Sequence, residues 1–170
     1  MVIRNEKPGD IDKIWHINVE AFGTAVEADL VNTLRDSGSP YISLVYEQNS
    51  QPVGHIMFTP VELTGDTSGL RLMGLAPMSV IPRYQNSGIG SSLVDTGIEL
   101  CKAEGYDAIV VLGRPEFYSR FGFVPSVRYG IKSEYDVPPA VFMILELKEN
   151  GLIGKHGTIK FHDSFAGIEQ

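Results

Sequence analysis

A glycine-rich turn, Gln85-Asn86-Ser87-Gly88-Ile89-Gly90, is the stretch of this 170-residue chain whose residue types point most clearly to chemistry. A strand-like run precedes the turn and a long helical pattern follows it, so the turn opens a helix. The first turn of a helix has unpaired N–H groups and a partial positive charge, which together can hold a phosphate or pyrophosphate. Gly88 and Gly90 lack side chains and let a bulky diphosphate approach the backbone. Simple turn chemistry is the alternative explanation.

The residues around this turn exclude two common nucleotide-binding motifs. No Lys-Ser/Thr pair follows the glycines, as a Walker A loop requires, and the spacing is not G-x-G-x-x-G. Pro77 removes a ladder donor from the preceding strand, which predicts a bulge or a locally unpaired edge. Met78, Ser79 and Val80 would then offer free backbone groups to an extended, amide-containing ligand. The alternative is that Pro77 only marks an edge strand.

A second candidate stretch runs from Val110 to Pro125 and again places a strand before a short helix. This helix presents Tyr118 and ends at Gly122-Phe123. Two strands that each lead into a helix bring two loops together at the carboxyl ends of the strands, where α/β sheets bind ligands.

The elements that must position these residues follow from apolar periodicity and turn residues. Strands are expected at Val2–Arg4, Tyr41–Glu47, Val53–Val61, Leu72–Ile81, Ala108–Leu112 and Val141–Leu147, with a further one at Gly157–Phe161. Helices are expected after Asp10, around Val26–Leu34, from about Ser87 to Glu104, and at Pro115–Phe121. This order predicts a mixed α/β sheet with an antiparallel first half and one right-handed β-α-β crossover.

Composition and charge limit the class of function. A net charge of −7 argues against a general nucleic-acid binder, and the apolar runs are too short to span a membrane. The N-terminus shows no apolar signal segment, and the single cysteine, Cys101, fits a reducing compartment, so we expect a cytoplasmic protein. Between Arg83 and Arg128 the chain has five basic and five acidic residues, so the acid excess belongs to the remainder. That locally neutral segment is where an anion would be tolerated.

Both motifs resemble those of the GCN5-related N-acetyltransferase (GNAT) superfamily. Gln85-x-x-Gly88-x-Gly90 looks like its acyl-CoA pyrophosphate loop, and Phe117-Tyr118-x-x-x-Gly122-Phe123 resembles its second signature. The Gly54–Pro60 strand, the Leu75–Pro82 run and the Gly157–Phe165 tail further resemble the YhbS-like subgroup of predicted acetyltransferases. The resemblance implies one domain over residues 1–170, with 150–170 as a C-terminal extension packed on it. It also implies a GNAT fold: a mixed α/β (α+β) central sheet of about six or seven strands, flanked by about four helices and splayed between the fourth and fifth strands.

The resemblance further implies that acetyl-CoA binds between the Leu72–Ile81 and Ala108–Leu112 strands and donates its acetyl group directly to a primary amine. The pantetheine would pair with backbone at Met78 and Val80, and the pyrophosphate would lie on Gln85–Ser91. The full set of implied cofactor contacts is Met78, Ser79, Val80, Gln85, Asn86, Ser87, Gly88, Ile89, Gly90, Ser91, Gly113, Phe117, Tyr118 and Phe121.

Tyr118 is the implied proton donor to the departing CoA thiolate. A phenol with a pKa of about 10 is a plausible donor to a thiolate whose acid has a pKa of about 8.5. The phenol can also stabilise the thiolate by a hydrogen bond without full transfer, and a packed aromatic residue is the structural alternative. The acceptor amine must lose a proton, for which Glu27, Glu62 and His55 are the candidate bases. Desolvation in the pocket is the alternative to a dedicated base.

Several alternative hypotheses about chemistry, donor and assembly remain. Cys101 lies on the apolar stripe of the long helix, which favours packing over a nucleophilic role, and the four histidines show no metal-ligand spacing, so we expect no metal. A CoA-binding regulatory or interaction module with little turnover is the alternative to an enzyme, and a longer acyl-CoA is the alternative donor. The first two helices and late loops such as Ser126–Pro139 would build the acceptor pocket. A homodimer through the late strands is possible.

Overall fold

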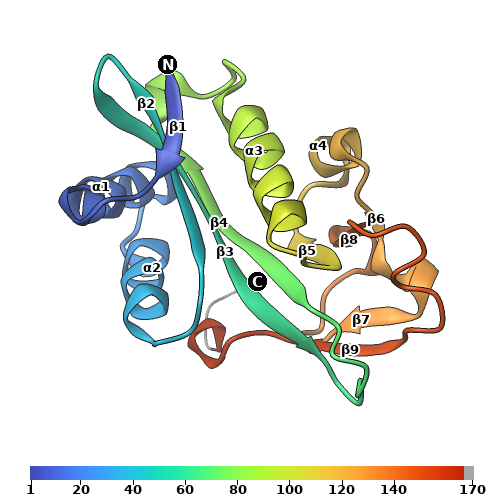
Figure 1. The fold of residues 1–170 in the computed structure, drawn as a ribbon. Helices are drawn as coiled ribbons and strands as arrows, with labels where there is room; N and C mark the ends of the chain where they lie inside the picture. The colour runs from blue at the N-terminus through green and yellow to red at the C-terminus, as the bar shows by residue number, and fades with distance from the viewer. Residues whose placement is uncertain (167–170) are drawn as a thin grey trace. The chain divides into compact units, whose positions relative to one another are not determined.

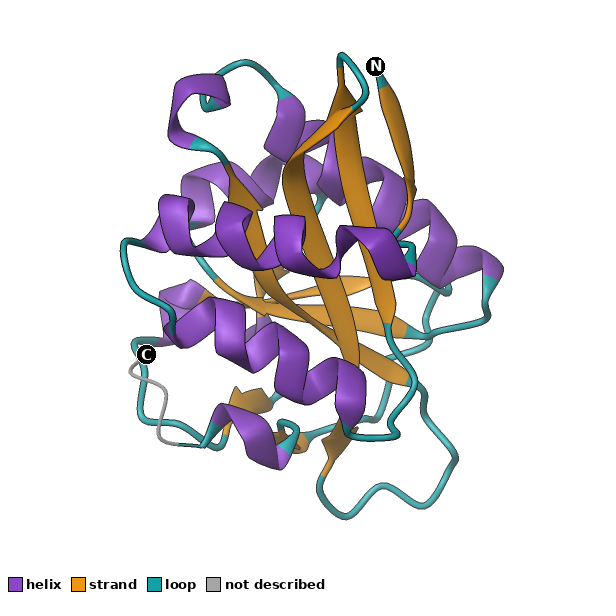
Figure 2. Cartoon of the chain, turned by 90° about the vertical axis from the view of Figure 1, so that its left-hand side faces the viewer, coloured by secondary structure: helices purple, strands orange, loops and turns teal. Residues whose placement is uncertain are grey.

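The computed structural model describes residues 1–166, in which the chain forms four α-helices and nine strands (Figures 1 and 2). The helices are α1 (Ile11–Phe22), α2 (Val26–Asp36), α3 (Ile89–Ala103) and α4 (Pro115–Tyr118). The strands are β1 (Val2–Asn5), β2 (Ile42–Gln48), β3 (Gln51–Leu63), β4 (Leu72–Val80), β5 (Ala108–Leu112), β6 (Val124–Pro125), β7 (Ile131–Ser133), β8 (Phe142–Glu146) and β9 (Gly157–Lys160). The chain divides into two compact units, and β3, β4 and α3 contribute residues to both.

The first unit comprises Met1–Thr59 and Ala76–Glu99. Its strands β1 and β2 are antiparallel, with Ile3 opposite Tyr46, and β2 continues into an antiparallel hairpin with β3, with Leu44 opposite Ile56. The Ile81 N–H donates to the Val53 carbonyl at 2.9 Å and joins the end of β4 to β3. The apolar faces of α1 and α2 cover this sheet with fully buried side chains, including Ile14, Ile17, Val31 and Leu34.

The second unit comprises Pro60–Leu75 and the chain from Leu100 onward. The start of β4 is parallel to β5, with Leu72 opposite Ala108, and β5 is antiparallel to β8, with Val110 opposite Ile144. Strand β9 pairs antiparallel with the end of β3 and parallel with β7. Side chains from β5, β7, β8 and β9 meet in one apolar cluster, which includes Val110, Ile131, Phe142, Ile144 and Ile159.

The predicted mixed α/β architecture with four helices and a parallel β4–β5 pair is confirmed. The strand count is higher than the six or seven expected, because β6 and β7 are additional. Strand β7 lies within the Ser126–Pro139 segment that was expected to be a loop. Its three residues carry little local signal, and their pairing depends on β9, more than twenty residues later in the chain. The expected splay between the fourth and fifth strands stays a prediction.

The short helix after β5 and the C-terminal extension add detail to what was expected. The expected Pro115–Phe121 helix changes after Tyr118 into a 3-10 turn, Ser119–Phe121, which ends at Gly122 with a φ of +98°. Within the expected extension 150–170, the chain forms β9 and a 3-10 turn at Asp163–Phe165. The last four residues of that extension, 167–170, lie outside the described part of the chain.

Candidate functional site

The turn between β4 and α3 folds back onto the strand that precedes it. After the 3-10 turn Pro82–Tyr84, the Gln85 side-chain amide donates to the Val80 carbonyl at 2.9 Å, and the Gln85 N–H donates to the Pro82 carbonyl at 3.1 Å. The glutamine of the motif thus fixes the turn on the end of β4. The structure brings together two groups of predicted cofactor contacts, Met78–Val80 and Gln85–Ser91, within the first unit.

Gly88 marks the entry into α3. Its φ of +90° is a left-handed conformation that strongly favours glycine, and its carbonyl accepts a hydrogen bond from the Ser92 N–H at 3.0 Å. No atom lies within 4 Å of where a Cβ on Gly88 would stand, so the space above this backbone is open. The first N–H groups of a helix have no carbonyl partner in the preceding turn. The motif therefore leaves open space at Gly88, next to the N-terminus of α3.

Two glycines hold α3 against β3. A Cβ on Gly54 would lie 2.9 Å from Ile89 Cγ2, and a Cβ on Gly97 would lie 2.3 Å from two ring carbons of Phe58. The helix therefore approaches the strand more closely than any larger residue allows at either point. Because Ile89 is the first residue of α3, the contact at Gly54 also fixes where the glycine-rich turn stands on the sheet.

The strand segment Met78–Val80 combines burial with an unpaired polar group. Ser79 is 3% exposed, and its hydroxyl has no hydrogen-bond partner in the described part of the chain. Such a buried, unpaired hydroxyl is uncommon in a folded protein. Met78 is half-buried and Val80 is 8% exposed.

Tyr118 lies in the second unit at the carboxyl end of β5. Its ring covers Gly113, where a Cβ would stand 2.2 Å from Tyr118 Cε2. The ring also makes edge contacts with Phe117 and Phe123, at centroid distances of 4.9 and 5.6 Å, and Phe117 contacts Phe121 at 5.3 Å. The predicted contacts Gly113, Phe117, Tyr118 and Phe121 are thus one cluster.

Burial changes the acidity of Tyr118. The side chain is 8% exposed, and this desolvation raises the pKa of Tyr118 to about 12, although nearby Arg114 opposes the shift. Compared with a thiol pKa of about 8.5, the phenol is then a weaker acid by roughly 3.5 units, or about 5 kcal/mol. Because the phenol holds its proton more tightly than a thiol does, Tyr118 favours a hydrogen bond to a thiolate over complete proton transfer.

The three candidate bases have different surroundings. Glu27 is half-buried in the first turn of α2. Glu62 is exposed near the end of β3, opposite Lys160 of β9. His55 is fully buried in β3, and this desolvation lowers the pKa of His55 to about 4.

His55 belongs to a buried polar chain that the sequence did not reveal. Its Nε2 lies 2.8 Å from the Ser43 hydroxyl, which in turn donates to the Glu6 carboxylate. Glu6 also accepts two hydrogen bonds from Arg35, at 2.6 and 3.1 Å. Because the Ser43 proton is used by Glu6, His55 Nε2 carries its own proton and donates to Ser43. The other members of this chain come from β2, α2 and the residue that follows β1, and local periodicity cannot show that these segments meet.

Further observations concern chemistry outside the two motifs. Cys101 is fully buried, and burial together with Glu104 raises the pKa of Cys101 to about 12, which disfavours a thiolate. In residues 1–166 no group of three or more His, Cys, Asp or Glu side chains is arranged to hold a metal ion. The same residues include no helix with the length and apolar character that a membrane crossing needs.

Comparison with known proteins decides the family. Residues 2–126 match the acetyltransferase (GNAT) domain family. The chain is 32% identical over 166 residues to the uncharacterized N-acetyltransferase YhbS of Escherichia coli K12, which covers 97% of this chain and 98% of that protein. The chain belongs to the GNAT family of acetyltransferases. The predicted likeness of this GNAT chain to the YhbS-like subgroup is confirmed by the same match.

Solved structures agree with this assignment of the GNAT chain. Escherichia coli YhbS in complex with CoA superposes with a TM-score of 0.93 at 31% identity, covering 99% of this chain and 93% of that one. A GNAT acetyltransferase from Brucella melitensis in complex with acetyl-CoA superposes with a TM-score of 0.79, also at 31% identity, covering 96% and 97%. The predicted acetyltransferase activity class and GNAT fold are therefore confirmed.

Proposed function

We propose that this chain transfers an acetyl group from acetyl-CoA to a primary amine by direct attack in a ternary complex. The observation that carries the proposal is the glycine-rich turn, which leaves open space at Gly88 beside the start of α3 and is tied to β4 by the Gln85–Val80 hydrogen bond. A pyrophosphate on Gln85–Ser91 would receive N–H donors and the positive end of the helix dipole. The complexes of two relatives with CoA and acetyl-CoA support this assignment.

The remaining proposed contacts with acetyl-CoA follow from the same motifs. Backbone groups of Met78 and Val80 would pair with the amides of the pantetheine, as an added strand does. The unpaired Ser79 hydroxyl is a further hydrogen-bonding group on this segment. Gly113, Phe117 and Phe121 would supply apolar contacts around Tyr118.

The proposed reaction has one bond-forming and one bond-breaking event. The neutral amine nitrogen attacks the thioester carbonyl carbon, the C–N bond forms, and the C–S bond then breaks to release CoA thiolate. Tyr118 donates its hydroxyl proton, or a hydrogen bond, to the departing sulfur, and its raised pKa favours the hydrogen bond. The proton lost by the amine leaves through a base or through solvent.

Glu27 is the preferred base in this proposal. An amine with a pKa of about 10.4 is mostly protonated at neutral pH, so a carboxylate that receives its proton through water aids the reaction. Glu27 is half-buried, whereas Glu62 is exposed opposite a lysine and His55 is enclosed in a hydrogen-bonded chain. Accessibility together with partial desolvation favours Glu27.

We also propose that residues 1–170 form one acyltransferase domain and that its C-terminal extension, as far as residue 166, packs on it. Leu152 is 1% exposed in the apolar cluster of the second unit, and β9 pairs with both β3 and β7, which supports this view. The single, buried Cys101 supports a reducing, cytoplasmic location.

The cofactor assignment is tested by titrating acetyl-CoA into the wild type, Gly88→Ala and Gly69→Ala by calorimetry. Both glycines have a positive φ and open space around a Cβ, so the two substitutions impose similar backbone strain of about 1 to 2 kcal/mol. Gly69 lies in the turn between β3 and β4, outside the proposed contacts. We expect weaker binding in Gly88→Ala alone. Absence of binding to the wild type, or equal effects of the two substitutions, would contradict the proposal.

A further inference from the structure

The glycine-rich turn lies between two contacts with neighbouring residues of β3. Before the turn, the Ile81 N–H donates to the Val53 carbonyl at 2.9 Å. After the turn, Ile89 Cγ2 lies only 2.9 Å from the position that a Cβ on Gly54 would take, so helix and strand are in close contact there. Both ends of the turn therefore rest on Val53 and Gly54, and the position of the turn follows that of this short piece of β3.

His55 is the next residue of β3 and faces the opposite side of the sheet, because successive residues of a strand alternate. On that side its Nε2 lies 2.8 Å from the Ser43 hydroxyl of β2, and its Nδ1 lies 3.5 Å from the side-chain nitrogen of Asn18 of α1. The same Asn18 nitrogen donates to the Ile14 carbonyl at 3.0 Å, which fixes it within α1. The imidazole is therefore held at both of its nitrogen atoms.

The chain beyond Ser43 ends in an enclosed ion pair. The Ser43 hydroxyl donates to Glu6, whose carboxylate accepts two hydrogen bonds from Arg35 of α2. The Glu6 and Arg35 side chains are only 9% and 8% exposed, and Arg35 also donates to the Asn32 side chain at 2.6 Å. Moving either group would leave a buried charge without its partner, which is costly. The ion pair therefore holds Ser43, and through it His55, in one orientation.

The pairing of β3 with β4 also brings His55 beside the Met78–Val80 segment. The two strands are neighbours in the sheet, and the Val53–Ile81 hydrogen bond joins the start of β3 to the end of β4, so they run antiparallel. Two positions further into each strand, the same register sets His55 opposite Ser79. His55 is thus adjacent both to the residues that hold the turn and to the segment proposed to pair with the pantetheine.

We propose that His55 is a positioning residue for acetyl-CoA: its buried hydrogen-bonded chain holds Val53 and Gly54, and through them the glycine-rich turn, in the arrangement that binds the cofactor. This inference rests on the proposed function. His55 is fully buried and faces away from Ile89 of α3, so it acts through its neighbours in β3 and not by touching the cofactor. The role needs no proton transfer by the imidazole, only its two hydrogen-bonding nitrogen atoms.

The kinetic test removes the nitrogen atoms of His55 and then restores one of them. His55→Leu should raise KM for acetyl-CoA by about tenfold and change kcat by less than about threefold, because the loss of a buried hydrogen bond displaces the binding turn but no reacting group. His55→Gln supplies an N–H that can reach Ser43 and should recover most of the affinity.

A second variant breaks the same chain at another residue. Ser43→Ala should also raise KM for acetyl-CoA, and its combination with His55→Leu should add little, because both remove one link. Ser37→Ala is the control: it removes a serine hydrogen bond in the same unit, to the Leu34 carbonyl at 2.8 Å, outside the chain. KM for acetyl-CoA in Ser37→Ala should equal that of the wild type.

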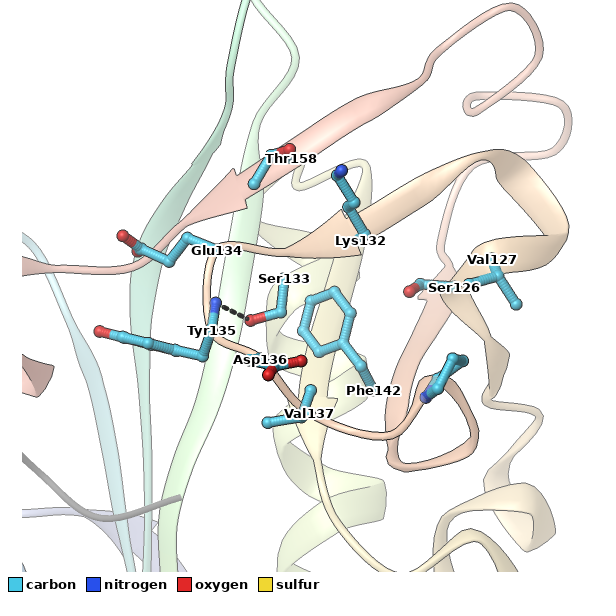
Figure 3. A pocket seen from close by; sticks show the side chains of 11 residues that line it. Ser126, Val127, Lys132, Ser133, Glu134, Tyr135, Asp136, Val137, Phe142 and Thr158 are labelled. Carbon is cyan, nitrogen blue, oxygen red and sulfur yellow. Dashed lines mark hydrogen bonds between the residues drawn. The ribbon is translucent and has the colours of Figure 1, made fainter.

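Amide hydrogen exchange in the free protein tests the positioning role without any cofactor. The N–H groups of Ile81, Gln85 and Ser92 are hydrogen-bonded around the turn and report its stability. The Tyr135 N–H, which donates to Ser133 Oγ at 3.0 Å in the second unit (Figure 3), is the internal reference. Breaking the chain should accelerate exchange at the turn amides and leave the reference amide unchanged.

The outcomes separate this inference from the proposed function. Unchanged KM and unchanged exchange at the turn in both His55→Leu and Ser43→Ala overturn the positioning role, as does an equal acceleration at the turn and at the reference amide. Should His55→Leu fail to fold, Ser43→Ala gives the same test. Failure of acetyl-CoA to bind the wild type would contradict the proposed function alone, while hydrogen exchange still decides the role of His55.

Discussion

At the scale of single residues, burial decides what the titratable groups can do. Tyr118 was predicted from its motif, but its raised pKa depends on Gly113 and Phe123, which close around the ring from other parts of the chain. His55 was predicted as a candidate base, and the fold encloses it beside Ser43. A motif in the sequence identifies a candidate residue, whereas the solvent exposure of that residue follows from tertiary contacts.

Removing the Tyr118 hydroxyl tests its role in leaving-group departure. We expect Tyr118→Phe to lower kcat by about 10- to 100-fold with little change in KM for acetyl-CoA, because the ring contacts remain and only the donor to sulfur is lost. Tyr106→Phe is the control, since Tyr106 is a similarly buried tyrosine of the second unit that stacks under Arg71. Full turnover in Tyr118→Phe would refute the donor role.

The same substitution has a signature in alkaline stability. The pKa of Tyr118 is raised to about 12 in the folded protein, so the unfolded state loses this proton first as pH rises above about 10. Wild-type stability therefore has a contribution, present below pH 10, that declines by roughly 2 to 3 kcal/mol toward pH 12. Chemical denaturation across this range should show a smaller decline in Tyr118→Phe, and identical slopes would contradict the burial of the phenol.

The buried His55 predicts a loss of folding stability at acidic pH. The pKa of His55 is lowered to about 4, so between pH 6.5 and 4 the unfolded state binds a proton that the folded state does not. Stability contributed by neutral His55 is present above pH 6.5 and is lost as pH falls, by roughly 3 kcal/mol at pH 4. In His55→Gln this component should be absent from denaturation midpoints, whereas His16→Gln, at an exposed position on α1, should retain it. A wild type with equal stability at both pH values would be inconsistent with this.

At the scale of elements, local patterns predicted α3 and the β2–β3 hairpin but not β6 and β7. The long helix shows its apolar stripe within its own sequence, and the hairpin has a polar turn between two apolar runs. Strand β7 instead depends on β9, more than twenty residues later in the chain. Such long-range pairings leave no periodic signal in three residues.

The close packing of α3 against β3 gives a prediction at this scale. Gly97→Ala would place a Cβ 2.3 Å from the Phe58 ring, which is fully buried. Overpacking costs about 1 to 3 kcal/mol, which exceeds the gain of about 1 kcal/mol in helix propensity. Gly97→Ala should therefore lower the denaturation midpoint, whereas Asp95→Ala, at an exposed position of the same helix, should leave it nearly unchanged. Stabilisation by Gly97→Ala would argue against this close approach.

At the scale of the whole molecule, charge is divided in a way that suits the proposed substrates. The segment from Arg83 to Arg128, which contains both motifs, is neutral, and the remainder carries the net charge of −7. An anionic donor would meet the neutral segment, and a cationic acceptor would be attracted by the remainder. The net charge alone argued against a general nucleic-acid binder, and its distribution along the chain adds the expected sign of the acceptor.

Direct acetyl transfer is tested by the initial rate of CoA release while acetyl-CoA and a primary amine are varied together. Direct transfer in a ternary complex predicts intersecting double-reciprocal lines, CoA release that requires the amine, and one N-acetylated amine formed for each CoA released. Parallel lines would indicate an acetyl-enzyme intermediate. Parallel lines, or CoA released without acetylated amine, would contradict direct acetyl transfer to an amine.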